Sequence, residues 1–263
     1  MEIEKSDVKA IRERHQPRGV LTERDAKACL WVLEQGAMTV DQLWRAVWWS
    51  DASRGPRYAY ERVLFLERAG FLVRIATPYS QKNYFRATRM AQELVSGRSE
   101  GYGPLPLSSP PLNEIPHADL LTEIRLLIAR SGRHAASETW WRPDRVLSVD
   151  PGFPRERFYG ILPDAIWVTR RGKRIAVEYE RTRKGITRVR PKVEALSREI
   201  ARTDRAIDFV LWVATPAARV DLAVVLPAHP AQRLRSFEEL KSELAGQVDE
   251  DTKAGEGHHV RSV

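Results

Sequence analysis

Apolar residues recur at helical spacing in three runs near the N-terminus, and each run has its own start signal. Thr22–Gln35 begins with an N-cap threonine and carries Asp25 three positions later. The second run begins at Thr39, and Gln42 stands where a capping box places its second polar residue. The third run covers Arg57–Ala69. This part of the chain therefore predicts three short helices.

Alternation of apolar and polar residues follows directly and predicts two strands, Phe71–Thr77 and Asn83–Thr88. Three helices and then a hairpin are the order of a winged helix-turn-helix. The stretch Leu66–Val73 resembles the end of a recognition helix entering the first wing strand of bacterial winged-helix domains. In that interpretation the third helix enters the major groove of DNA and the wing contacts the backbone or minor groove. The residues predicted to contact DNA are Arg54, Arg57, Tyr58 and Arg62 on the helix, with Lys82 and Arg86 on the wing. The alternative is a module for dimerisation or protein docking.

Residues 97–116 contain three Gly, five Pro and three Ser, so neither a helix nor a central strand is expected to persist there. We interpret this stretch as a linker between a domain over residues 21–96 and a second domain over residues 117–245. Residues 1–20 form a polar leader, and residues 246–263 are expected to be a disordered tail.

The second domain alternates between helical and strand patterns, which predicts an α/β (α+β) fold with a mixed sheet flanked by helices. The pattern leaves 216–225 open between helix and strand. The predicted elements are a helix from His117 to Arg130, an edge strand within Ser137–Val149, a hairpin of Ile161–Val168 and Arg174–Tyr179, a helix over Arg190–Thr203, a buried strand over Ile207–Ala214 and a closing helix over Phe237–Leu244.

Two carboxylates occupy facing strands of the predicted hairpin. A loop of two to four residues places Asp164 opposite Glu178, give or take one position. Opposed residues of an antiparallel pair lie about 4.5–5.5 Å apart, so the two charges repel unless a cation lies between them. Mg²⁺ accepts such oxygen ligands. The alternative is a solvated hairpin face that carries scattered charges.

The same residues resemble the PD-(D/E)XK nuclease signature. Pro163-Asp164 is followed, after thirteen residues, by Glu178-Tyr179-Glu180. The resemblance implies that Asp164 and Glu178 bind Mg²⁺ or Mn²⁺ and that Glu123, on the preceding helix, adds a ligand; otherwise Glu123 is a helix-surface residue. Glu180 stands where the motif has lysine, as in some restriction endonucleases with Glu-x-Glu. The water-activating group is then Glu180 or Lys192, which we expect in the first turn of the next helix.

Positive charge concentrates around this hairpin. The chain has a net charge of +8 and a sequence pI near 9.8, which favours an anionic partner. Ten basic side chains lie between residues 170 and 192. Those predicted to contact DNA phosphates are Arg181, Arg183, Lys184, Arg188 and Arg190.

A winged helix joined to a PD-(D/E)XK-like domain resembles the replication-relaxation family of bacterial mobile elements. The resemblance covers roughly residues 20–225 and rests on short motifs, which include Thr22–Asp25 and His117 as well as the acidic residues above. It implies DNA binding in plasmid or mobile-element processing, with a relaxase, a helicase or another element protein as a further partner, and a homodimer is compatible with it. Two functions remain open, a metal-dependent endonuclease and a catalytically inactive adaptor or regulator.

Composition adds three expectations. No apolar run approaches the ~20 residues that cross a bilayer, so no membrane association is expected. The charged N-terminal residues lack the apolar core of a secretory signal, which favours a cytoplasmic location. The single cysteine, Cys29, lies in an apolar helical pattern and is expected to be a core residue.

Overall fold

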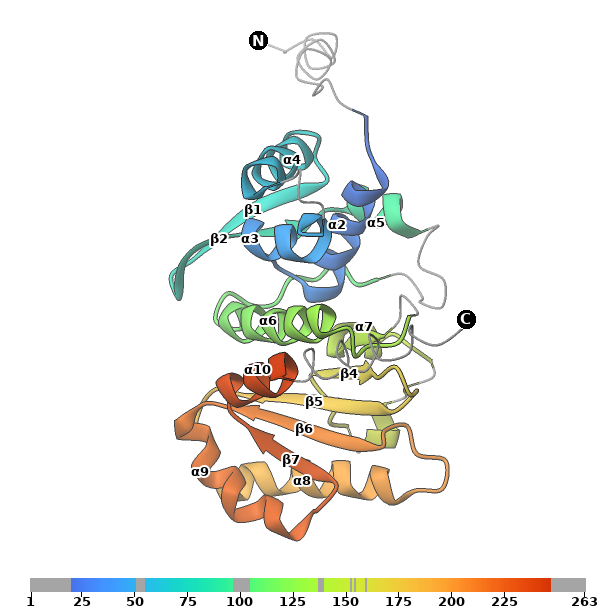
Figure 1. Cartoon of the computed structure of the whole chain (residues 1–263), viewed down its shortest axis with the longest axis vertical. Helices are drawn as coiled ribbons and strands as arrows, with labels where there is room; N and C mark the ends of the chain where they lie inside the picture. The colour runs from blue at the N-terminus through green and yellow to red at the C-terminus, as the bar shows by residue number, and fades with distance from the viewer. Residues whose placement is uncertain are drawn as a thin grey trace, which may run out of the picture. The chain divides into compact units, whose positions relative to one another are not determined.

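The computed structural model describes residues 20–50, 55–96, 105–136, 140–151, 153, 155–158 and 160–246, and it has the predicted mixed α+β composition (Figure 1). The chain divides into two compact units, Met1–Thr122 and Glu123–Val263. The division falls within helix α6 (Ile115–Ser131), which begins inside the stretch predicted to be a linker. Within the described ranges, no helix is long and apolar enough to span a membrane.

The first unit begins with helices whose N-termini are fixed by capping boxes, predicted at Thr39 and, at Thr22, predicted only as an N-cap. Thr22 Oγ1 accepts a hydrogen bond from the Asp25 amide at 3.3 Å, and the Thr22 amide donates to Asp25 Oδ2 at 2.8 Å. Thr39 and Gln42 make the equivalent pair at 3.2 and 3.0 Å. The helical segments are α2 (Glu23–Gln35), α3 (Val40–Leu43), the π-helical η1 (Trp44–Trp48), α4 (Pro56–Arg68) and α5 (Arg89–Ser96).

The predicted hairpin follows α4. Strands β1 (Leu72–Thr77) and β2 (Ser80–Ala87) pair antiparallel, and Thr77 pairs with Ser80. The second strand thus begins earlier than the pattern indicated, because the ladder continues past a bulge almost to the turn. Helix α5, which the sequence analysis did not predict, then packs against α2. Because α3 and η1 are continuous, three helical segments precede the hairpin, which is the predicted element order.

The second unit contains a five-stranded sheet in the order β3-β4-β5-β6-β7. The pairs β3–β4 and β4–β5 are antiparallel, whereas β5–β6 and β6–β7 are parallel. The strands are β3 (Trp141–Pro143), β4 (Ala165–Val168), β5 (Arg174–Glu180), β6 (Phe209–Ala214) and β7 (Gln232–Arg235). The helical segments after α6 are α7 (Asp144–Leu147), η2 (Arg155–Phe158), α8 (Ile186–Ala201), α9 (Pro216–Val225), η3 (Leu226–Ala228) and α10 (Phe237–Gly246).

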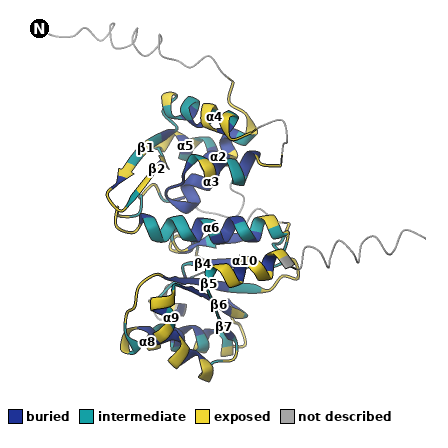
Figure 2. Ribbon diagram, turned by 60° about the vertical axis from the view of Figure 1, so that its left-hand side comes forward, coloured by how far each residue is buried: buried dark blue, intermediate teal, exposed yellow. Residues whose placement is uncertain are grey.

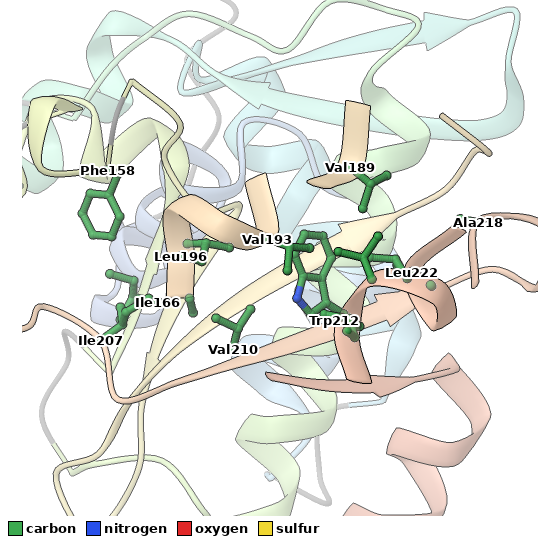
Figure 3. Packing of buried hydrophobic residues seen from close by; sticks show 14 of the residues in the cluster. Phe158, Ile166, Val189, Val193, Leu196, Ile207, Val210, Trp212, Ala218 and Leu222 are labelled. Atoms are coloured by element: carbon green, nitrogen blue, oxygen red, sulfur yellow. The ribbon is translucent and has the colours of Figure 1, made fainter. Parts of the chain in front are cut away.

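One face of this sheet holds the main core of the unit. Ile166 of β4 and Trp212 of β6 point into a cluster with Val193 and Leu196 of α8 (Figure 3). Ala176 of β5 belongs to the same cluster. Helix α9 completes the cluster through Ala218 and Leu222. Figure 2 shows buried positions along the strands and exposed positions on the outer sides of α8 and α9. Because side chains alternate along a strand, Glu178 points to this same face two residues after Ala176.

Several predicted boundaries in the second unit are wrong. Helix α8 begins at Ile186, so Pro191 lies inside the helix and Lys192 is not in its first turn. Gly185, with φ of +80°, makes the turn that starts the helix early. The predicted 137–149 strand is only three residues long and is followed by α7, and Pro216–Val225 is a helix. Strand β7 was not predicted, because its four residues carry two arginines and have no clear alternation.

Candidate functional site

Asp164 lies immediately before β4, where the hairpin register sets its position. Ala165 pairs with Val177, so the same register places Asp164 opposite Glu178, as predicted. Asp164 Oδ2 accepts a hydrogen bond from the Tyr179 amide at 2.7 Å. The Asp164 carbonyl accepts another from the Asp144 amide at 2.8 Å. The carboxylate is therefore held beside the end of β5.

Glu178 carries its carboxylate into the core face of the sheet. Its side chain is 1% exposed, and its register neighbour on β6 is Trp212. Neither carboxylate oxygen receives a well-formed hydrogen bond from a described residue. Burial raises the pKa of Glu178 well above its ordinary value, against the opposing attraction of Lys192. A carboxylate in such a place is costly unless a cation accompanies it.

Lys192 supplies that positive charge from α8. Its ammonium is in ion-pair contact with Glu178, and Nζ lies 3.8 Å from Asp164 Oδ1. Nζ also lies 5.9 Å from the centre of the Trp212 ring. Burial alone would lower the pKa of Lys192, but the nearby carboxylates of Glu178 and Asp164 raise it above its usual value. The three residues form a compact acidic pair with one ammonium, called the Asp-Glu-Lys cluster below.

Glu180, the residue in place of the motif lysine, has a different partner. Its carboxylate is paired with Lys184, with Nζ 2.8 Å from Oε1. The negative charge of Glu180 also contributes to the raised pKa of Lys192. Between the two residues that the sequence left open, it is Lys192 that contacts the acidic pair.

The position of Lys192 depends on Asp221, which the sequence analysis did not single out. The Asp221 carboxylate is buried, accepts a hydrogen bond from the Gly185 amide at 2.9 Å, and lies 3.3 Å from Arg183 Nε. It thereby fixes the turn that begins α8. An aspartate within the apolar run Val220–Val225 was the signal available in the sequence.

The residues present fit a divalent ion held by two carboxylates. No group of three or more His, Cys, Asp or Glu side chains placed to bind a metal occurs in the described ranges, so Glu123 does not join Asp164 and Glu178 there. Mg²⁺ commonly binds one or two protein carboxylates and completes its shell with water and substrate phosphate. Glu178 Oε1 has no hydrogen-bond partner among the described residues, and Lys192 contacts Oε2.

Basic residues surround the start of α8, and two of the five predicted phosphate contacts are already paired. Arg183 pairs with Asp221 and Lys184 with Glu180. The others, Arg181, Arg188 and Arg190, are exposed. Arg188 precedes Lys192 by four residues and so shares its side of the helix.

The residues predicted to contact DNA on α4 differ in their surroundings. Arg57 has a 91% exposed side chain and pairs with Glu61 one turn away. Tyr58 places its ring edge against Trp48, with centroids 6.4 Å apart. Arg62 is only 17% exposed and binds the fully buried Asp25, with Nε 3.1 Å from Oδ1. Arg62 therefore holds α4 against the capping box of α2. Arg54 lies outside the described residues.

On the hairpin, Lys82 and Arg86 are both exposed. Lys82 Nζ forms an ion pair with Asp119 Oδ2 at 2.8 Å, so the Asp119 carboxylate neutralises part of the lysine's charge. Asp119 also accepts a hydrogen bond from the Gln42 side chain at 2.9 Å. Arg86 is the hairpin residue best placed to meet an anionic partner.

Comparison with known proteins does not assign the chain to a family. No protein-family model and no curated protein matches it. One solved structure that it resembles is that of TrmBL2, described as an archaeal chromatin protein with a novel mode of DNA binding. The match has 14% sequence identity, covers 87% of this chain and 78% of that one, and has a TM-score of 0.21. Similarity at that level carries no argument about fold or function.

Proposed function

We propose that this chain binds DNA and hydrolyses its phosphodiester bonds at the Asp-Glu-Lys cluster with a divalent metal ion. The observation that carries the proposal is the ammonium of Lys192, which contacts Glu178 and lies 3.8 Å from Asp164. A lysine beside two carboxylates is the donor set of the PD-(D/E)XK signature, with the lysine supplied by α8. The exposed Arg181, Arg188 and Arg190 near the start of α8 add the positive charge that a phosphate backbone requires.

Each residue of the cluster has a distinct role in this proposal. Asp164 and Glu178 would hold Mg²⁺ or Mn²⁺, which when bound neutralises the phosphate and lowers the pKa of water. The raised pKa of Lys192 keeps its side chain an ammonium with three N–H donors, so it orients water or stabilises charge on the phosphate. Arg181, Arg188 and Arg190 bind the flanking phosphates.

The first unit would deliver the DNA. The order of three helical segments and a hairpin supports a winged helix-turn-helix in which α4 enters the major groove. Arg57 and Tyr58 on α4 and Arg86 on β2 are the proposed contacts. Arg57 is 91% exposed and its partner Glu61 is exposed as well, whereas Arg62 and Lys82 pair with carboxylates that are buried or largely buried. Binding of this kind depends on salt concentration, with a slope set by the number of neutralised phosphates.

A cleavage assay tests the proposal. Purified protein is incubated with linear and supercoiled, single- and double-stranded DNA, with EDTA, Mg²⁺ or Mn²⁺. We expect cutting that requires the metal and is lost in Asp164→Asn, while the variant still binds DNA. Absence of metal-dependent cutting on every substrate would contradict the enzymatic part.

The inactive adaptor remains the second candidate because Glu180 occupies the motif-lysine position and is paired with Lys184. It predicts DNA binding that depends on Arg57 and Arg86, with no effect of Asp164→Asn on any activity. The same experiments therefore separate the two functions.

A role in plasmid or mobile-element processing, beside a relaxase or helicase, is supported by the resemblance to the replication-relaxation family. Deletion of the gene from its element should impair maintenance or transfer, and wild-type protein should restore it. If the Asp164→Asn protein fails to restore maintenance or transfer, the biological role requires the Asp-Glu-Lys cluster. Full restoration by this variant would favour the inactive adaptor.

A further inference from the structure

A second concave site lies in the same unit, away from the Asp-Glu-Lys cluster. It is a pocket of about 570 Å³ whose lining includes Trp167, Ile175 and Leu211. These residues alternate with Ile166, Ala176 and Trp212, which belong to the core under α8, so the pocket opens on the opposite face of the sheet. Ile175 also precedes Glu178 by three residues, about 10 Å along β5. The pocket is thus separate from the site proposed to cut DNA.

The floor of the pocket is apolar and aromatic. Trp167, Ile175 and Phe209 are register neighbours across β4, β5 and β6 and form one row. Leu240 and Leu244 of α10 close one side. Phe209 is 41% exposed, which is unusual for a phenylalanine on a central strand. Such a surface suits a flat apolar ring system.

Positive charge rings this floor. The six basic residues in the lining are Arg133, Arg170, Arg171, Lys173, Arg233 and Arg235, against one carboxylate, Glu243. Glu243 is paired with Arg235, and Lys173 lies 3.9 Å from Asp208.

Four of these cations have no such neutralising partner. Arg133, Arg170, Arg171 and Arg233 form no ion pair with any residue in the described part of the chain. They come from three separate places in the sequence: the end of α6, the β4–β5 turn and β7. Four uncompensated guanidinium groups around one cavity repel one another, and a polyanion would remove that repulsion.

Trp167 provides a further observation. Its side chain is more than nine-tenths buried, and its indole N–H has no hydrogen-bond partner among the described residues. An unpaired buried donor is unfavourable.

We propose that this pocket binds a nucleoside polyphosphate. The base would lie on the row of Trp167, Ile175 and Phe209, and the phosphates would bind the four uncompensated arginines. The planar guanidinium group can donate two parallel hydrogen bonds to phosphate oxygens. The volume lies within the range of small-ligand pockets. An inorganic anion would leave the apolar floor unused, and an uncharged ring would leave the arginines uncompensated. Nucleotide binding here is independent of DNA cleavage at the cluster.

Calorimetric titration with ATP, ADP, AMP and tripolyphosphate, in EDTA and at fixed ionic strength, tests this proposal. We expect one ATP per chain, affinity that increases with the number of phosphates, and weaker binding of tripolyphosphate than of ATP. The double variant Arg171→Met/Arg233→Met should weaken ATP binding at least tenfold. Phe209→Ala should weaken ATP binding but leave tripolyphosphate binding unchanged.

Matched controls keep the result specific to the pocket. Lys241→Met removes an exposed cation from α10 that does not line the pocket, and it should bind ATP as the wild type does. Asp164→Asn should also bind ATP normally, which separates this proposal from the proposed nuclease. No saturable ATP binding, equal affinity for ATP and tripolyphosphate, or an unchanged double variant would each overturn it. Pocket-dependent binding of oligothymidylate without ATP binding would overturn it as well.

Discussion

Lys192 on α8 forms an ion pair with Glu178 on β5, and this contact joins an arginine-bearing helix to the buried acidic end of a central strand. Glu178 is 1% exposed and Lys192 22%. The pair is therefore largely withdrawn from water, and each charge depends on the other for compensation. The geometry makes the pair important for stability as well as for the proposed chemistry.

Removing only the lysine should destabilise the fold. Lys192→Met leaves a buried carboxylate without its cation, and we expect a loss of about 3 kcal/mol in the free energy of unfolding, measured with urea. The double variant Glu178→Gln/Lys192→Met should recover most of that loss, because the uncompensated charge is gone. Lys241→Met is the control, since Lys241 and its partner Glu238 are both exposed, and the change should cost about 0.5 kcal/mol. Equal losses in both lysine variants would contradict the account.

Replacing two arginines of α4 should have different effects, one on the stability of the fold and the other on DNA binding. Arg62→Ala removes the partner of the fully buried Asp25, so we expect a loss of about 3 kcal/mol in unfolding free energy. Arg57→Ala removes a 91% exposed side chain and should leave stability unchanged while it weakens DNA binding. Thermal unfolding and salt-dependent DNA binding of both variants provide the measurement. A stable Arg62→Ala protein would refute the structural role assigned to that residue.

Cys29 should be unreactive in the native protein. Burial, assisted by the charge of Asp25, raises the pKa of its thiol to about 12, and thiolate is the reactive form. At pH 8 an aromatic disulfide reagent should therefore modify no thiol in the folded chain and one thiol in denaturant. Rapid reaction of the native protein would show that the first unit opens readily at α2.

Asp221 should affect cleavage without touching the DNA. It fixes the Gly185 turn from which α8 begins, and α8 carries Lys192. Asp221→Ala should reduce the rate of cutting by at least tenfold with little change in DNA affinity, and Asp221→Asn, which keeps an acceptor oxygen, should recover part of it. A loss of affinity with an unchanged rate would instead assign Asp221 to DNA binding through Arg183.

The sequence predicted features that depend on neighbouring residues. The Thr22 N-cap, the Thr39–Gln42 capping box, the β4–β5 register and the buried β6 strand follow from local spacing and alternation, and the structure contains them. Features set by distant contacts were missed. The turn at Gly185, after which α8 begins, is held by a hydrogen bond to Asp221, thirty-six residues away. Arg62 binds Asp25, thirty-seven residues away. Neither contact leaves a periodic signal in the sequence.

The most direct test of the central claim compares two matched pairs of variants in the cleavage assay. Glu178→Gln and Lys192→Met change the cluster, whereas Glu180→Gln and Lys184→Met change the adjacent pair on the same strand and loop. Metal-dependent cutting that is abolished in the first two variants and retained in the last two is the predicted result. Cutting that survives in Glu178→Gln and Lys192→Met, or is lost equally in all four, would contradict the assignment of the site.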